Sequence, residues 1–400
     1  MIPWEEAVAR IQTELSPLGT ERVPLLDALG RALAETVELP CDLPPFANSA
    51  MDGYALRSAD VREPPFALPV SGERFAGAAP GAPIAPGTAV RIFTGAPLPP
   101  GADTVVKQEE TTREGDTVRI HGRPAPGDFV RPAGEDGRRG EIALAPGHEL
   151  LAPELGRLAA LGRSTVQVHL RPRVAILASG DELVAPDEPM REGGVRESNG
   201  IALAAAAIEA GAVPVLLGIA RDRPGEAERL LATAASCDAV VTCGGASVGE
   251  RDLLKDALRA LGAEERFWRV AIKPGKPFGF YRLPGGRPVF LLPGNPASAS
   301  VTFELFVRPG LRRLAGLTCH GRPEIDAPLA AAARKPAELA LWVRGNLVDG
   351  AFVASPHQSS GLTRSLVGQR ALAVLPRGAA ALDAGTKVRV RLLGGALGPS

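Results

Sequence analysis

The chain has 400 residues, with 45 Lys and Arg against 45 Asp and Glu, so its formal net charge at pH 7 is zero. This length leaves room for several domains, and the balanced charge favours neither a nucleic acid nor an anionic membrane as partner. Four cysteines without CxxC spacing and five histidines without an HExxH motif argue against a zinc site or a disulfide framework. No apolar stretch reaches membrane-spanning length, so we expect a cytoplasmic protein.

The N-terminal part and a later segment carry helix-like patterns of apolar residues. One pattern runs from Val8 to Leu15 and a second from Leu25 to Leu33. A third pattern, at residues 153–161, is placed to pack back on the N-terminal segment. We therefore predict a helical linking domain made of residues 1–39 plus 141–170.

Two regions show short β-like runs separated by turn-forming residues. Residues 40–140 are dense in proline and glycine, with short β-like runs at 88–93 and 104–107. This predicts a small β domain inserted into the helical one. Residues 321–400 predict a C-terminal β domain, with short strands at 341–343, 371–375 and 387–392.

Residues 171–314 alternate between strand and helix patterns. Strands are expected at 173–178 and 213–219, a helix begins near Ser198 and ends at Gly211, and another covers 224–236. Such alternation is typical of a doubly wound, three-layer α/β domain. The predicted fold class is thus multidomain α/β.

The most informative segment of the chain is VVTCGGASVGERDLLK, residues 240–255. An apolar strand enters a glycine-rich loop, and a helical pattern follows. Glycines let backbone N–H groups approach a phosphate, and the helix N-terminus adds its dipole. Asp252 could cap that helix or hold Mg²⁺ beside the phosphate. The loop is neither GxGxxG nor GxxxxGK[ST], so dinucleotide and Walker-type sites fit poorly. The candidate phosphate-binding residues are Gly244, Gly245, Ser247 and Gly249.

Two further loops follow short apolar strands in the same region. Lys273 and Lys276 flank a Pro-Gly turn, and Pro293 and Asn295 belong to the turn LPGNP. Loops at the carboxyl ends of parallel strands line one crevice, so we expect all three loops to meet there. Only six of the 45 basic residues are lysines, which suggests that a compact ammonium is needed where lysine is retained.

Carboxylates also follow the predicted strands of this region. Glu182 follows the first strand, Asp222 the second and Asp252 the third. Carboxylates at one sheet edge repel each other unless a cation joins them, and Mg²⁺ takes such oxygen ligands. A helix cap is an equally good explanation of Asp222 alone. We predict Mg²⁺ bound by Glu182, Asp222 and Asp252.

These segments resemble a known family. GGASVGERD, IKPGKP and LPGNP in this order, together with PPFANSAMDGYAL (44–56) and RIFTGAPLPPGADTVVKQEE (91–110), are similar to signatures of the molybdopterin molybdenumtransferases, which include a domain of gephyrin. The resemblance covers essentially the whole chain. It implies a molybdopterin-binding type of α/β domain. It also implies an enzyme that inserts molybdate into adenylylated molybdopterin and releases AMP.

The resemblance implies further site residues. Asp52, Thr94 and Asp136 match positions in the functional cleft of the family, although each also suits a turn. Arg344 and Ser360 match cleft positions in the C-terminal domain, and Arg269 stands where the family often has lysine. Together with Lys273 and Lys276, Arg269 is expected to attract molybdate, which is a substrate. Arg223 is a departure, because the family often has a second acid there.

The resemblance also implies partners. We expect a homodimer whose cleft combines one subunit's α/β domain with the other's β domain. Other expected partners are the enzyme that adenylylates molybdopterin and the proteins that mature molybdoenzymes. Two alternative functions stay open: an adenylyltransferase that acts on molybdopterin with ATP, and a non-catalytic scaffold on the same fold.

Overall fold

The computed structural model describes residues 1–79, 81–244 and 253–394 of the chain. The chain divides into two compact units, which are described separately. The larger unit comprises residues 1–35, 146–159 and 163–400, and the smaller unit comprises residues 36–145 and 160–162. Among the described helices, none is long and apolar enough to cross a membrane.

The smaller unit is built on a six-stranded sheet in the order β7-β4-β6-β5-β9-β8. Its core is formed by the inward-facing residues of these strands, among them Tyr54, Leu56, Val106 and Ile120. The short pairs β2–β11 and β3–β10 carry the chain into and out of this sheet. The strands are β2 (Val37–Glu38), β3 (Asn48–Ser49), β4 (Gly53–Leu56), β5 (Phe66–Arg74), β6 (Ala89–Ile92), β7 (Thr104–Lys107), β8 (Thr111–Glu114), β9 (Thr117–Ile120), β10 (Val130–Arg131) and β11 (Ile142–Leu144).

The larger unit contains a mixed six-stranded sheet in the order β16-β13-β17-β21-β20-β18. The first four strands are parallel, whereas β20 and β18 run antiparallel at one edge. The strands are β13 (Arg173–Ser179), β16 (Val213–Ala220), β17 (Ala239–Cys243), β18 (Glu264–Trp268), β20 (Gly279–Arg282) and β21 (Pro288–Leu292), with the short parallel pair β14 (Leu183–Val184) and β15 (Val195–Arg196) beside it.

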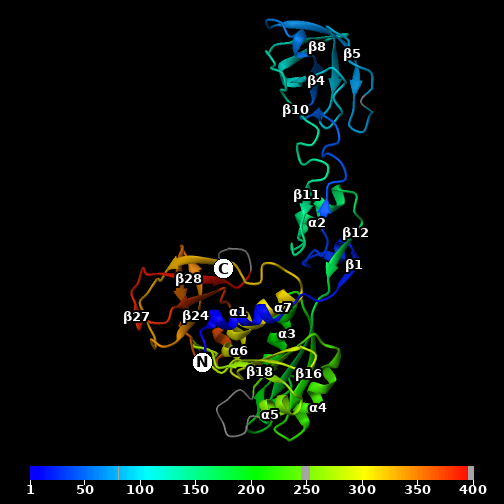
Figure 1. The fold of residues 1–400 in the computed structure, drawn as a ribbon. Helices are drawn as coiled ribbons and strands as arrows, with labels where there is room; N and C mark the ends of the chain where they lie inside the picture. The colour runs from blue at the N-terminus through cyan, green and yellow to red at the C-terminus, as the bar shows by residue number, and fades with distance from the viewer. Residues whose placement is uncertain (80, 245–252, 395–400) are drawn as a thin grey trace. The chain divides into compact units, whose positions relative to one another are not determined.

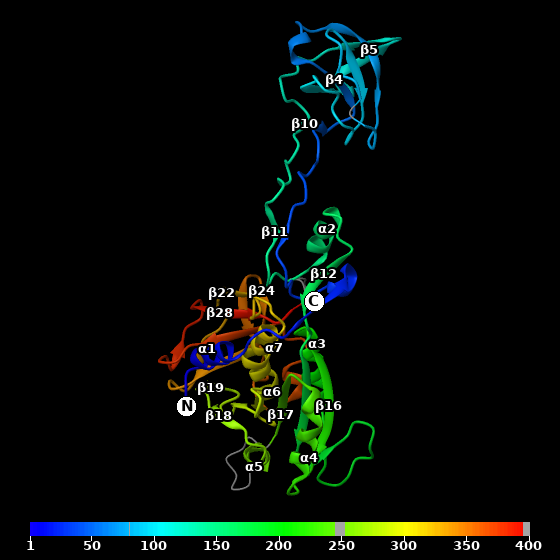
Figure 2. The same ribbon diagram turned by 45° about the vertical axis from the view of Figure 1, so that its right-hand side comes forward.

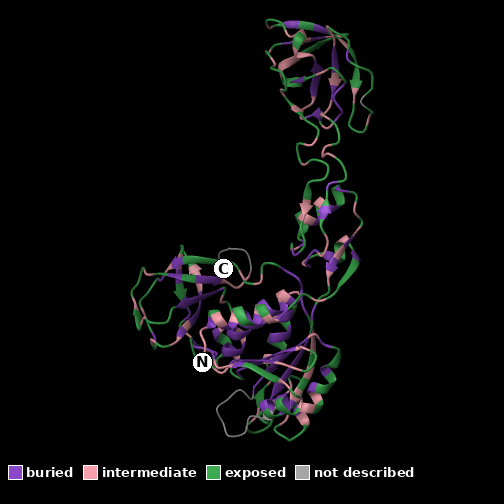
Figure 3. Ribbon diagram, viewed as in Figure 1, coloured by how far each residue is buried: buried purple, intermediate pink, exposed green. Residues whose placement is uncertain are grey.

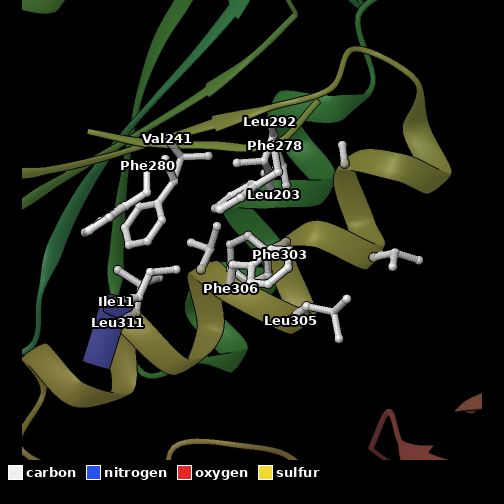
Figure 4. Packing of buried hydrophobic residues seen from close by; sticks show 14 of the residues in the cluster. Ile11, Leu203, Val241, Phe278, Phe280, Leu292, Phe303, Leu305, Phe306 and Leu311 are labelled. Atoms are coloured by element: carbon white, nitrogen blue, oxygen red, sulfur yellow. The ribbon is translucent and has the colours of Figure 1, made fainter. Parts of the chain in front are cut away.

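Helices cover both faces of this sheet, which gives the three layers expected from the sequence (Figure 2). One face packs against α1 (Trp4–Glu14), α3 (Asn199–Glu209) and the continuous segment α6 (Pro296–Thr302), a π-helical turn (Phe303–Val307) and α7 (Arg308–Leu314). Figure 4 shows Phe303, Phe306 and Leu311 of that segment packed near Val241 and Phe280 of the sheet. The other face packs against α4 (Glu226–Thr233) and α5 (Leu253–Ala260).

The C-terminal sheet has the order β19-β24-β26-β28-β22, and β25 pairs with β24. Its first strand is Ile272–Lys273, which pairs in parallel with Ala340–Leu341 of β24. The KPGKP turn was expected to belong to the α/β region, but its strand is an edge of the C-terminal sheet. The strands are β19 (Ile272–Lys273), β22 (Glu324–Pro328), β24 (Ala340–Val348), β25 (Ala351–Ala354), β26 (Ala371–Leu375) and β28 (Lys387–Leu392), and β23 (Ala333–Arg334) pairs with β27 (Ala381–Leu382).

The segment between α1 and residue 35 differs from its sequence pattern. The second helix, expected over Leu25–Leu33, is a single 3₁₀ turn, Leu25–Ala28, preceded by β1 (Thr20–Pro24), which pairs antiparallel with β12 (Thr165–His169). Gly30 is in the left-handed conformation (φ 72°), so a helix that starts after Pro24 cannot continue to Leu33. Leu26 is 84% exposed and Leu29 51%, whereas Leu33 is fully buried, so the apolar pattern does not form one buried face. Figure 3 maps burial along the chain. Helix α2 (Ala152–Ala160) does form as expected.

Candidate functional site

The carboxyl ends of β13, β17 and β21 come together in the larger unit. The Gly244 N–H, just past β17, donates to the Leu292 carbonyl at 3.2 Å. Gly244 has φ +104°, and a Cβ added there would lie 2.4 Å from the Ser179 carbonyl oxygen. Only glycine allows this close approach of backbones. The first glycine of the predicted phosphate loop is therefore required by the packing of the strand ends.

The remainder of that loop lies outside the described residues. Gly245, Ser247, Gly249 and Asp252 all fall in the segment 245–252. The description resumes at Leu253, where α5 begins. The roles predicted for these four residues remain predictions.

Two of the predicted acidic residues lie on adjacent loops. The Gly180 N–H donates to the Ala220 carbonyl at 3.1 Å, and the Asp222 N–H donates to Asp181 Oδ1 at 3.0 Å. These bonds tie the loop that carries Glu182 to the loop that carries Asp222. The structure thus brings together the ends of β13 and β16, as the doubly wound topology requires.

A basic residue that the sequence did not single out holds the Glu182 loop. Arg221 Nη1 donates to the carbonyls of Gly180 (3.4 Å), Asp181 (3.3 Å) and Leu183 (2.6 Å). Arg191 also donates to the Asp181 carbonyl. Arginine is the commonest basic residue of this chain, so neither position carried a signal in its composition.

The described donors suit a magnesium ion chemically but do not complete a site. Glu182 and Asp222 offer carboxylate oxygens, which Mg²⁺ prefers. The carbonyls of the Glu182 loop are already engaged by Arg221. Within residues 1–79, 81–244 and 253–394, no group of three His, Cys, Asp or Glu side chains could hold a metal ion. The third predicted ligand, Asp252, lies in the segment 245–252.

The PGN turn after β21 is joined to the loop that carries Ser360. Asn295 Nδ2 donates to Ser360 Oγ at 3.3 Å, and the Ala297 N–H donates to the Ser360 carbonyl at 2.9 Å. Pro293 is buried, and its carbonyl accepts the Cys243 thiol proton at 3.3 Å. The turn that contains Pro293 and Asn295 is therefore in contact with the Ser360 loop, and the binding role of these three residues remains a prediction.

Arg344 lies behind this loop with an unusual environment. Its side chain is fully buried, and Nε and Nη1 have no hydrogen-bond partner. Nη2 only approaches the carbonyls of His357 and Ser359, at 3.4 Å each. Burial lowers the pKa of the guanidinium from its usual value. A buried cation with free donors is suited to bind an anion.

The three other predicted cations follow one another around the KPGKP turn. Lys273 and Lys276 are exposed, and neither forms an ion pair with any described carboxylate. Gly275 between them has φ +105°, and a Cβ there would lie 2.4 Å from Thr302 Cγ2, so the turn is pressed against α6. Arg269 has the left-handed φ of 67°, rare for arginine, and its guanidinium lies over the Trp268 ring at 4.1 Å.

In the smaller unit, Asp52 and Thr94 form a pair. The backbone N–H and the hydroxyl of Thr94 both donate to Asp52 Oδ1 at 2.8 Å. These two bonds, the backbone one first, hold the pKa of the Asp52 carboxyl below its usual value, with a further contribution from Arg91. Asp52 is therefore ionised at neutral pH. Asp136 lies in another segment of this unit, where its backbone N–H donates to the Leu43 carbonyl at 2.8 Å.

Comparisons with known proteins agree along the chain. Three family models match: the MoeA N-terminal region (domain I and II) at residues 2–162, the probable molybdopterin binding domain at 175–313, and the MoeA C-terminal region (domain IV) at 326–393. A molybdopterin molybdenumtransferase of Nostoc sp. is 41% identical over 384 residues, covering 93% of this chain and 88% of that protein. The chain belongs to the molybdopterin molybdenumtransferase family.

Other members of the family support this assignment at lower identity. The molybdopterin molybdenumtransferase of Bacillus subtilis is 34% identical and covers 98% of this chain and 94% of that protein. A crystal structure titled molybdopterin biosynthesis MoeA protein from Pyrococcus horikoshii OT3 matches with a TM-score of 0.86 and 30% identity. It covers 98% of this chain and 100% of that one. The predicted family and the multidomain α/β fold are confirmed.

Proposed function

We propose that this protein inserts molybdate into adenylylated molybdopterin and releases AMP. The observation that carries the proposal is the full-length similarity to proteins named molybdopterin molybdenumtransferase, at 34–41% identity. The substrate is polyanionic, and the larger unit offers a close backbone turn at Gly244, after β17, and a buried guanidinium at Arg344, within β24. Both features suit the recognition of phosphate.

The chemistry divides among this chain's own residues. The Gly244 loop would hold the nucleotide phosphate, and Lys273, Lys276 and Arg269 would attract molybdate and balance charge. Breaking a phosphoanhydride depends on positioning and charge neutralisation more than on a protein nucleophile. Mg²⁺ held by Glu182, Asp222 and Asp252 would neutralise charge on the leaving phosphate. The four cysteines are free, which suits a reducing cytoplasm.

The direct test supplies the purified protein with adenylylated molybdopterin, molybdate and Mg²⁺ and measures AMP. We expect AMP release that depends on molybdate, together with pterin that activates a molybdenum-free molybdoenzyme. A parallel reaction with ATP and molybdopterin tests the adenylyltransferase alternative. AMP release without molybdate, or pyrophosphate release from ATP, would contradict the proposed function. Absence of turnover in every arm would favour a scaffold.

Lys273 offers a sharper test of the residue assignments. Lys273→Ala should raise the KM for molybdate or lower kcat, because an exposed, unpaired ammonium is lost. Lys273→Arg should rescue only in part if a compact charge is needed. The matched control is Arg139→Ala, an exposed cation in the smaller unit. Equal activity in all three variants would remove Lys273 from the site.

We further propose that the active form is a homodimer in which Asp52 of one copy completes the cleft of the other. Support comes from an exposed apolar surface on the edge strand β16 and on α3, where Ile201, Ile208 and Leu216 are each more than half exposed. Asp52→Ala and Asp252→Ala should each be inactive alone. Co-refolded, they should recover roughly a quarter of wild-type activity. A verified heterodimer without activity would contradict the shared cleft.

The same assignment leads us to propose that the enzyme supplying adenylylated molybdopterin and the maturation proteins that receive the cofactor are this protein's partners. Both would handle the same pterin.

A further inference from the structure

Asn199, the first residue of α3, makes two hydrogen bonds outside its own helix. Its side-chain Nδ2 donates to the Gly294 carbonyl at 2.7 Å and to Cys243 Sγ at 3.2 Å. Cys243 is the last residue of β17, and its thiol in turn donates to the Pro293 carbonyl at 3.3 Å. One amide thus links the start of α3, the end of β17 and the PGN turn after β21.

The backbones that this amide joins run very close together. The Gly244 N–H donates to the Leu292 carbonyl at 3.2 Å, and a Cβ added to Gly294 would lie 3.4 Å from the Gly244 Cα. From the PGN turn the contacts continue through Asn295 to Ser360. A shift of Gly294 would therefore move both the first glycine of the predicted phosphate loop and the loop that carries Ser360.

Asn199 does not serve as the cap of its own helix. The Ser198 side chain makes no capping bond, and the Gly200 N–H is satisfied by Glu197 Oε1 at 2.7 Å. Glu197 supplies an acceptor to the first turn of α3, whereas the Asn199 Nδ2 is a donor, which no N–H of that turn can use, and it donates to the neighbouring loops. Figures 1 and 2 show α3 on the face of the sheet that α6 also covers.

We propose that Asn199 is a positioning residue, which holds the Gly244 turn and the PGN turn in the geometry required by the substrate. The proposal rests on the proposed function for its catalytic consequence. Its structural part, that one amide fixes both turns, stands on the hydrogen bonds alone. Asn199 is not expected to touch the reacting atoms.

The chemistry of the network explains why asparagine is needed. The amide has two N–H donors, and both acceptors, a carbonyl and a sulfur, have lone pairs. Aspartate has the same shape but only acceptors, so its carboxylate would face the Gly294 carbonyl without a proton between them. Burial raises the pKa of the Cys243 thiol to about 12, so the thiol keeps its proton and its bond to Pro293 at neutral pH.

The decisive variant is Asn199→Asp, compared with Asn199→Ala and with the control Asn346→Ala. Asn346 accepts a hydrogen bond from the Arg370 N–H at 2.8 Å at the end of β24, so the control also removes one asparagine contact. We expect Asn199→Asp to lower kcat/KM for adenylylated molybdopterin by roughly 10- to 100-fold, because small displacements of positioning groups have effects of this size. Asn346→Ala should leave kcat/KM unchanged.

Two measurements on the ligand-free protein make the structural part independent of activity. Amide hydrogen exchange at Gly244 and Ala297 should accelerate in both Asn199 variants, and iodoacetamide should label Cys243 faster, as mapped by mass spectrometry. Thermal unfolding should stay close to wild type, since the change is local. Asn199→Ala serves if Asn199→Asp does not fold.

Three results would overturn the proposal: unchanged kcat/KM in Asn199→Asp, unchanged exchange and labelling, or a loss of activity that matches a general loss of stability. If the wild-type protein releases no AMP, the proposed function fails. Exchange and labelling then still decide whether Asn199 holds the two turns.

Discussion

Glu304 and Arg344 are both buried charged side chains of the larger unit, but their surroundings differ. Glu304, in the π-helical turn, accepts two hydrogen bonds from Arg308, at 2.7 and 2.9 Å, and two from Arg322, at 3.1 and 3.3 Å. Arg344 has no carboxylate partner in the described chain and leaves Nε and Nη1 unbonded. The negative charge of Glu304 is thus paired with two arginines, one in α7 and one in the segment after it. The positive charge of Arg344 has no such partner among the described residues, and it lies beside the loop that carries Ser360, where an anionic substrate is proposed to bind.

The largest expected effect is on the matched group. Glu304→Gln should lower the free energy of unfolding by about 3–5 kcal/mol, because it takes the carboxylate away from the buried Arg308 and the partly buried Arg322 and leaves them only the exposed Glu209 as counter-charge. Chemical denaturation measures this. The comparison variant is Glu209→Gln, because Glu209 pairs with the same Arg308 and Arg322 but its side chain is 60% exposed, and it should cost under about 1 kcal/mol. Equal losses in both variants would mean that the buried carboxylate of Glu304 contributes no more than the exposed one of Glu209.

The unmatched group should behave in the opposite way. Arg344→Met removes a buried cation that makes few hydrogen bonds in the ligand-free protein. The free energy of unfolding should therefore stay constant or rise. Its kcat/KM should fall roughly 10- to 100-fold, the loss of a charge-assisted hydrogen bond of about 1.5–3 kcal/mol. Denaturation and AMP release measure the two effects. A destabilised protein with full activity per folded molecule would make Arg344 structural.

Acid should remove the stability that the ionised Glu304 contributes to the folded protein. Burial raises the pKa of Glu304, but the hydrogen bonds and charges of Arg308 and Arg322 outweigh burial and lower it below 4.5. A depressed folded pKa contributes stability that is complete above about pH 4.5 and is lost as the pH falls through the folded value. The stability gap between wild type and Glu304→Gln should therefore narrow below about pH 4.5. A gap that stays constant down to pH 3 would contradict this.

The smallest expected effect is a change in the pKa of a third charged side chain, Asp52. It is paired with neutral donors of Thr94 rather than with a buried cation. Thr94→Val removes the hydroxyl donor but keeps the backbone one, so the pKa of Asp52 should rise part of the way to its usual value. Carbon-detected NMR titration of the Asp52 carboxyl measures the shift. An unchanged pKa would show that the backbone N–H of Thr94 is sufficient.

The sequence by itself determined the elements with strong periodicity or strict backbone demands. The strands at 104–107, 371–375 and 387–392 match β7, β26 and β28, because short apolar or alternating runs between turn formers leave few other structures. Gly244 was identified from its loop alone, and a glycine is indeed the only residue that fits beside Ser179. The same reasoning failed at Leu25–Leu33, where apolar spacing implied a helix that the left-handed Gly30 interrupts.

Tertiary structure decided which loops lie beside each other, because that depends on which strand ends meet in the folded chain. Pairing of Ile272–Lys273 with β24 places the KPGKP turn at the edge of the C-terminal sheet, and no local pattern records a partner some 70 residues away. Arg221, Asn199 and Cys243 matter through atoms contributed by other loops, and Arg344 through the absence of a partner among the described residues. Periodicity reports which face of an element is apolar. A hydrogen bond between distant loops, or a buried charge left without one, exists only once the chain has folded.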